Sequence, residues 1–235
     1  MKRLLTILSL IILGTSMGFS QNGKNKPIKS EFFIKGGFGT SWIIMPKAFL
    51  SDSSDPDNNW QILPATNNFT AYAGMQAVFP LGAHWLFVPE IDYNFIAGQI
   101  RVDQLKPDSV SGLPKSSQKL QTYSRIEVPL NFGVLSSDNF WVSFGPVIYF
   151  TIADNKGFDN AVYELTQQAT INSDNPVGLR FRLAAYLTLS SRAYIDIKFD
   201  SDLSRKFEFS DNVYQMKMSM QSITLGLGWR TFKNK

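Results

Sequence analysis

The segment Leu179–Leu189 alternates between two kinds of side chain. Every odd position is apolar, whereas the even positions include Arg180, Arg182, Tyr186 and Thr188. Successive side chains of a β-strand point to opposite faces, so this segment predicts a strand with one apolar face and one charged face. The same alternation recurs along the chain, which restricts the fold to a set of two-faced strands.

The first 20 residues have the pattern of a cleaved export signal. Met1–Arg3 is positively charged, Leu4–Leu13 is almost wholly apolar, and Gly18 and Ser20 supply the small residues that precede a cleavage site. The apolar stretch is too short to cross a bilayer, which takes about 20 residues. We therefore expect three parts: a signal peptide (1–20), a short polar periplasmic segment (21–30) and an outer-membrane β-barrel domain (31–232).

Composition excludes several classes of protein. The chain has no cysteine, which rules out a lipid-anchored precursor and a disulfide framework. No stretch of 18 consecutive apolar residues follows the signal, so no helical membrane span is expected. Cleavage removes Lys2 and Arg3 and lowers the formal charge from +4 to +2, which gives no basis for a nucleic-acid partner. Aromatic residues make up 14% of the chain, a high fraction that suits contact with lipid and its interface.

Period-two alternation predicts eight strands, at about 31–45, 69–80, 85–97, 120–135, 140–153, 177–190, 193–204 and 214–232. Their connections are alternately long and short, except that the seventh is intermediate in length. Outer-membrane barrels have an even number of strands, short periplasmic turns and long external loops. We therefore predict an all-β fold: an eight-stranded antiparallel up-and-down transmembrane β-barrel with both termini in the periplasm. A short helix at 157–169 is a further expectation within the fifth connection.

The two faces of these strands differ in chemistry. Bulky apolar residues occupy the face that we expect to meet lipid, and six basic and six acidic residues occupy the opposite face. Because eight strands enclose a space just wide enough for side chains to fill, the charges should pair into a salt-bridged plug. Three of the charged residues, Lys35, Asp200 and Asp202, are expected at the rims in water, and Arg230 lies on the last strand. The expected interior network consists of Glu90, Asp92, Arg125, Glu127, Arg180, Arg182, Asp196 and Lys198.

Two places interrupt the alternation. On the last strand, Met216 to Met220 are apolar at even positions, whereas Ile223 to Trp229 are apolar at odd positions. Either a bulge at Gln221–Ser222 restores a single face, or the methionines belong to an extracellular extension. Pro89 and Pro129 lack the N–H that a strand ladder uses and predict local bulges or breaks.

Five short motifs follow one another along the chain. They are Lys35-Gly36-Gly37, Pro89-Glu90, Glu127-Val128-Pro129-Leu130, Gly145-Pro146 and Gly226-Leu227-Gly228-Trp229-Arg230. In this order they resemble the PorT-like outer-membrane β-barrel family of Bacteroidetes-type bacteria. The resemblance covers nearly all of the mature chain and implies an integral outer-membrane barrel, with no assigned activity for most members and a role in type IX secretion for few.

Nothing in the sequence predicts catalysis. Its single histidine, His84, falls in an expected periplasmic turn, and there is no Cys/His metal motif and no Gly-rich loop between a strand and a helix. We expect a non-enzymatic protein without cofactors that acts through its external loops at 46–68, 98–119 and 154–176.

Three other functions stay open: a small-solute porin, an accessory component of a type IX-like secretion system, and a secreted lipocalin-like carrier with an apolar ligand cavity. The lipocalin G-x-W is absent, because Gly39 and Trp42 have the wrong spacing. The expected partners are outer-membrane lipid, a protein at the external loops, and the outer-membrane assembly machinery, which would read the terminal segment Gly226–Phe232.

Overall fold

The computed structural model describes residues 30–44, 48–51, 59–64, 68–104, 116–155, 171–172, 176–203, 205–209 and 215–231. Among these residues, no helix is long and apolar enough to cross a membrane. The expected signal peptide and the expected helix at 157–169 lie outside the described residues.

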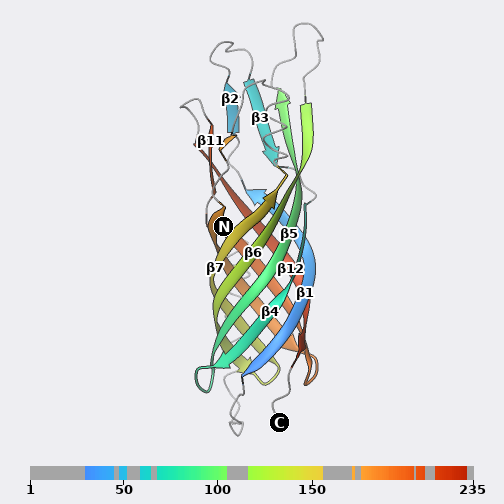
Figure 1. The fold of residues 1–235 in the computed structure, drawn as a ribbon, viewed down its shortest axis with the longest axis vertical. Coiled ribbons are helices and arrows are strands. Elements are labelled where there is room, and N and C mark those ends of the chain that lie inside the picture. The colour runs from blue at the N-terminus through green and yellow to red at the C-terminus, as the bar shows by residue number, and fades with distance from the viewer. Residues whose placement is uncertain are drawn as a thin grey trace.

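Eight strands close into a ring in which each strand is antiparallel to its neighbours (Figure 1). The first and last of them close the barrel, with pairs that run from Phe33↔Arg230 to Ile44↔Ser219. This confirms the eight-stranded up-and-down barrel. In ring order the strands are β1 (Glu31–Ile44), β4 (Asn68–Pro80), β5 (Trp85–Gln104), β6 (Ser116–Ser137), β7 (Phe140–Asp154), β9 (Val177–Thr188), β10 (Ala193–Asp202) and β12 (Gln215–Arg230).

Two neighbouring strands are longer than predicted. The hairpin of β5 and β6 continues past Gly98↔Gln121 as far as Asp103↔Ser116. In this extension the outward positions include Gln99, Arg101 and Gln118. Because neither face is consistently apolar there, the alternation that identified the rest of each strand is lost.

Four short strands lie in segments that we expected to be loops: β2 (Ala48–Ser51), β3 (Asn59–Pro64), β8 (Ile171–Asn172) and β11 (Arg205–Phe209). β3 pairs with the extended part of β5, and β2 pairs with β3. β11 pairs with the start of β12, and β8 pairs with β11. Figure 1 places β2, β3 and β11 at one end of the barrel, opposite the short turns. We call this end the extended end and the other the turn end.

The last strand has no bulge at the expected place. Its register with β1 is continuous through Gln221 and Ser222, and Met220 is buried on the same face as Ser222. Residues 215–218 instead pair with β11. The extension, rather than a bulge, therefore accounts for the change of pattern.

The strand prolines break the ladders without shifting the register. Pro89 pairs with Leu130, and the next pair in the same register is Asp92↔Glu127. Pro129 likewise precedes a gap in its pairing with β7. The register shifts of β6 and β7 lie elsewhere, at Ser124/Arg125 and Leu135/Ser137.

The barrel is apolar outside and polar inside. Leu179 and Leu225 on the outer face are 45% and 50% exposed, whereas Arg180 on the inner face is fully buried. A row of aromatic contacts crosses the outer face of four adjacent strands, through Phe32, Phe79, Phe87 and Phe132. A surface of this kind matches the lipid-facing band of an outer-membrane barrel.

Candidate functional site: the charged lumen

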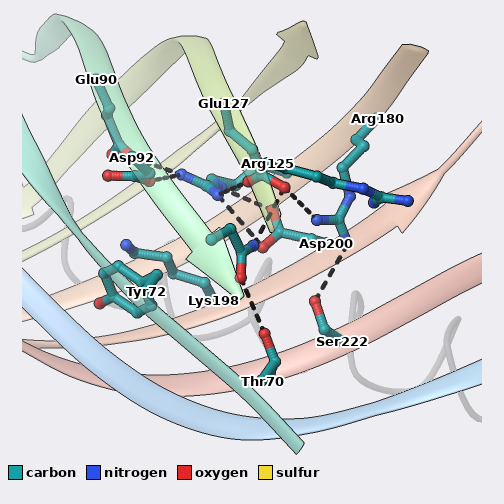
Figure 2. A network of polar contacts seen from close by, with 12 residues as sticks. Thr70, Tyr72, Glu90, Asp92, Arg125, Glu127, Arg180, Lys198, Asp200 and Ser222 are labelled. Atoms are coloured by element: carbon teal, nitrogen blue, oxygen red, sulfur yellow. Dashed lines mark hydrogen bonds and ion pairs between the residues drawn. The ribbon is translucent and has the colours of Figure 1, made fainter. Parts of the chain in front are cut away.

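All eight residues of the expected interior network have buried side chains. They come in pairs spaced two residues apart on β5, β6, β9 and β10, because residues i and i+2 of a strand share a face. Figure 2 shows side chains from these strands meeting across the lumen.

Arg182 occupies the middle of the network. Its Nη1 lies 2.5 Å from Oε2 of Glu90 and 2.7 Å from Oδ2 of Asp92, both on β5. Its Nη2 lies 3.0 Å from Oε2 of Glu127, and its Nε lies 2.7 Å from Oδ1 of Asp200. One planar guanidinium therefore joins β9 to β5, β6 and β10.

A second cation shares two of these carboxylates. Lys35 on β1 pairs with Glu90, and its Nζ lies 2.9 Å from Oδ1 of Asp92. Glu90 also accepts hydrogen bonds from Gln76 at 2.7 Å and from the Tyr186 hydroxyl at 3.0 Å. These contacts give the buried carboxylates the several donors that an ion needs away from water.

Toward the extended end, Arg180 bridges Glu127 and Asp202. Its Nη1 lies 2.5 Å from Oε1 of Glu127, and its Nε lies 2.6 Å from Oδ1 of Asp202. Its Nη2 reaches the Ser222 hydroxyl on β12 at 3.3 Å, a contact drawn in Figure 2. The Arg125 guanidinium lies close to Asp202 as well, at 3.5 Å.

The wall beside β12 holds a looser group. The Tyr72 hydroxyl donates to Oδ1 of Asp196 at 2.7 Å, while Nζ of Lys198 lies 3.8 Å from the same oxygen and 3.5 Å from the centre of the Tyr72 ring. The Tyr72 hydroxyl also lies so close to Gly226 that a side chain there would collide with it.

An aromatic layer closes the lumen at the turn end. Trp141 stacks on Tyr186 with ring centres 3.5 Å apart, and Tyr194 meets both rings edge-on. Phe33 packs against Tyr194 from β1. Below this layer lies a cavity of about 50 Å³, whose lining includes the ion-paired Glu31 and Arg230. A space of this size holds one or two water molecules.

Three charged residues are not where we expected them. Lys35, Asp200 and Asp202 were expected at the rims in water, but they are 3%, 2% and 4% exposed. The barrel interior is filled over more of its length than the sequence indicated, because Trp141 on β7 and Tyr123 on β6 are buried as well. Arg230 does lie at a rim, where its side chain is 22% exposed.

The uncharged members of the network were not predicted. Tyr72, Gln76 and Tyr186 each donate a hydrogen bond to one of its carboxylates. Tyr194 donates to the amide oxygen of Gln76. All four stand at inward-facing strand positions. Their alternation with apolar outward residues was the available signal.

The arrangement has the chemistry of a fixed, nearly neutral plug. Six buried carboxylates face five buried cations among the described residues, so no strong field favours ions of one sign. Within the part of the chain that the structure describes, no group of histidine, cysteine or carboxylate side chains could hold a metal ion. His84 lies in the exposed turn before β5, outside the network.

Comparison with known proteins identifies the fold but no family. No protein-family model matches the chain, and no curated protein sequence matches it significantly. Among solved structures, the outer membrane protein OprG from Pseudomonas aeruginosa matches with a TM-score of 0.50 and 11% identity, over 87% of this chain and 97% of that one.

Two further structures match with lower scores. The attachment invasion locus protein Ail of Yersinia pestis has a TM-score of 0.39 and 10% identity, over 87% of this chain and 100% of that one. The outer membrane protease OmpT from Escherichia coli has a TM-score of 0.39 and 8% identity, over 88% of this chain and 100% of that one. The closed ring of strands and the match to OprG together give this chain the fold of an outer-membrane β-barrel.

Proposed function

We propose that this chain is a non-enzymatic outer-membrane barrel with a closed lumen, which acts by presenting its extended end to a partner outside the cell. The observation that carries the proposal is the Arg182 network, which ties four strands together across the space that a solute would have to cross.

The outer surface supports placement in the membrane. Its exposed side chains are bulky and apolar on every strand of the ring, as with Phe38, Ile91, Phe144 and Leu225. Burying such a surface in lipid is favourable, whereas charges at the bilayer midplane would cost about 2–4 kcal/mol each for Lys and Arg. The expected signal peptide and the barrel fold both favour the outer membrane.

The filled lumen argues against a porin. A water-filled channel needs a continuous polar path, but the lumen is blocked first by ion pairs and then by the aromatic layer of Trp141, Tyr186 and Tyr194. It also argues against a lipocalin-like carrier, whose interior would be apolar. Liposome swelling tests this step: we expect sugars to enter vesicles containing the protein no faster than protein-free vesicles.

The extensions offer a platform beyond the membrane. β2, β3, β5 and β6 form neighbouring strands of one sheet that continues past the ring, and β8, β11 and β12 form a second extension. Backbone pairing makes such a platform more rigid than loops, which suits binding to a partner. The distance of His84 from this end supports a binding role over hydrolysis.

Orientation is tested by epitope tags. A tag inserted within residues 105–115, between β5 and β6, should be detected by antibody on intact cells. A matched tag in the Leu81–His84 turn should be detected only after the outer membrane is permeabilised. The reverse result would place the extended end in the periplasm and remove the proposal.

We extend the proposal to membership of the PorT-like family. Its support is the position of the motifs: Pro89, Pro129 and Pro146 stand on three adjacent strands, two of them at ladder breaks, and Gly226 makes room for Tyr72. A role as an accessory of type IX-like secretion is a separate possibility within that family. Unchanged protein secretion after deletion of the gene would exclude it.

A further inference from the structure

Arg125 uses its guanidinium differently from the other arginines of the lumen. Its side chain is fully buried, and its Nη1 makes one long contact of 3.5 Å with Asp202. Its Nε and Nη2 have no hydrogen-bond partner in the structure as described. By contrast, Arg182 places every nitrogen of its guanidinium beside a carboxylate.

The two unpartnered nitrogens of Arg125 form one recognition edge. In a planar guanidinium, the N–H groups of Nε and Nη2 point the same way and match two oxygens of a carboxylate or a phosphate. Paired contacts of this kind are among the stronger hydrogen bonds in proteins. Asp202 does not take this edge: its Oδ2 meets Arg125 through Nη1, and its Oδ1 lies 2.6 Å from Nε of Arg180.

Two tyrosine rings fix the plane of the guanidinium. Its central carbon lies 4.3 Å from the centre of the Tyr149 ring and 5.2 Å from that of Tyr123. Stacking on aromatic rings leaves the edge of a guanidinium available for hydrogen bonds. The rings also exclude water, which strengthens any ionic contact made there.

A further donor stands on the neighbouring strand. Thr151 is the cross-strand partner of Arg125, at the register shift between β6 and β7, so the two side chains share the inner face. The Thr151 hydroxyl oxygen is buried and has no hydrogen-bond partner within the described structure. Two neighbouring residues thus present unused donors toward the extended end of the lumen.

We propose that Arg125 and Thr151 form a binding site for a small oxyanion, either a carboxylate or a phosphate. An arginine that is buried with most of its donors unpaired is costly, and an oxyanion on the Nε/Nη2 edge supplies the missing acceptors. Thr151 donates to one oxygen of the bound anion. This site does not depend on the proposed role of the extensions.

The first test uses the full-length protein in detergent micelles. Its thermal unfolding midpoint is followed while chloride is replaced by acetate or by inorganic phosphate at constant ionic strength. We expect the midpoint to rise and then saturate with at least one of the two anions. A stronger response to acetate identifies a planar carboxylate as the preferred ligand, and a stronger response to phosphate a tetrahedral one. No saturable rise with either anion would overturn the proposal.

Variants then locate the site. Arg125→Lys keeps the charge but loses the paired edge, so half-saturation should move to an anion concentration at least about tenfold higher. Thr151→Val should weaken the response while keeping the shape of the side chain. Arg101→Lys, on the exposed part of β5, should respond as the unmodified protein does. An unchanged anion response in both Arg125→Lys and Thr151→Val would overturn the assignment of the site. If Arg125→Lys does not fold, an unchanged response in Thr151→Val is sufficient to overturn it.

Discussion

Nη1 of Arg182 lies 2.7 Å from Oδ2 of Asp92, although the two residues stand on strands separated by β6 and β7 in the ring. An ion pair of this kind ties the wall of the barrel to itself across its axis. Because neither side chain reaches water, the pair depends on the other members of the network for its remaining contacts. The interior charges therefore act as a unit.

Removal of Arg182 should be strongly destabilising. Arg182→Met leaves four carboxylates without their shared cation, and breaking a buried ion pair from one side costs about 3–5 kcal/mol. The free energy of unfolding can be measured in urea by the heat-modifiable mobility of the folded barrel. Arg101→Met is the matched control: its ion pair with Asp103 is exposed and should contribute less than about 1 kcal/mol. Equal stability of the two variants would show that the network is dispensable.

Arg180 and Glu127 should be energetically coupled. Their ion pair of 2.5 Å is buried. Arg180→Met leaves Glu127 with Arg182 as its ionic partner, and Glu127→Gln leaves Arg180 with Asp202, so each single variant removes the same contact from one side. The double variant should lose less stability than the sum of the two, by about 0.5–3 kcal/mol. A double-mutant cycle on urea unfolding measures this difference, and strict additivity would contradict the contact.

Gly226 should not tolerate a side chain. A Cβ at this position would collide with the Tyr72 hydroxyl and come within 2.8 Å of Oδ1 of Asp196. Gly226→Ala should therefore cost about 1–3 kcal/mol through overpacking. Gly82→Ala is the control, since nothing lies within 4 Å of a Cβ there. Tyr72→Phe, which removes the hydroxyl, should recover part of the loss; a harmless Gly226→Ala would refute the close approach.

Tryptophan fluorescence should separate the inside of the barrel from the outside. Trp141 is 7% exposed and stacks on Tyr186, whereas Trp85 is 55% exposed on the outer face. In single-tryptophan variants reconstituted in vesicles, brominated lipid should quench Trp85 but not Trp141, and aqueous acrylamide should leave Trp141 unquenched. Acrylamide quenching of Trp141 would indicate an open lumen.

The sequence predicted the barrel well because lipid and lumen impose opposite chemistry on alternate residues. Leu179 to Leu189 shows this on β9, where the arginines face in and the leucines face out. The same signal fails in the outer part of β5 and β6, where Gln99, Arg101 and Gln118 stand at outward positions and neither face is consistently apolar. Alternation also could not show how far Lys35 and Asp200 lie from the rims, because it identifies the face of a strand and not the position along the barrel axis.

The partners within the network could not be predicted from the sequence either. Alternation places Arg182 inside but does not choose its partners, which are Asp92 across the lumen as well as Asp200 on the adjacent β10. That choice depends on the stagger of the strands, which brings residues of distant strands to the same height.

The closed lumen is the central claim, and single-channel recording in planar bilayers tests it most directly. The purified barrel should insert without any steady conductance above that of the bare bilayer, because ion pairs and the aromatic layer fill its interior. Arg182→Met combined with Trp141→Ala should, where it folds, introduce measurable channel events. A steady open state in the unmodified protein would contradict the account.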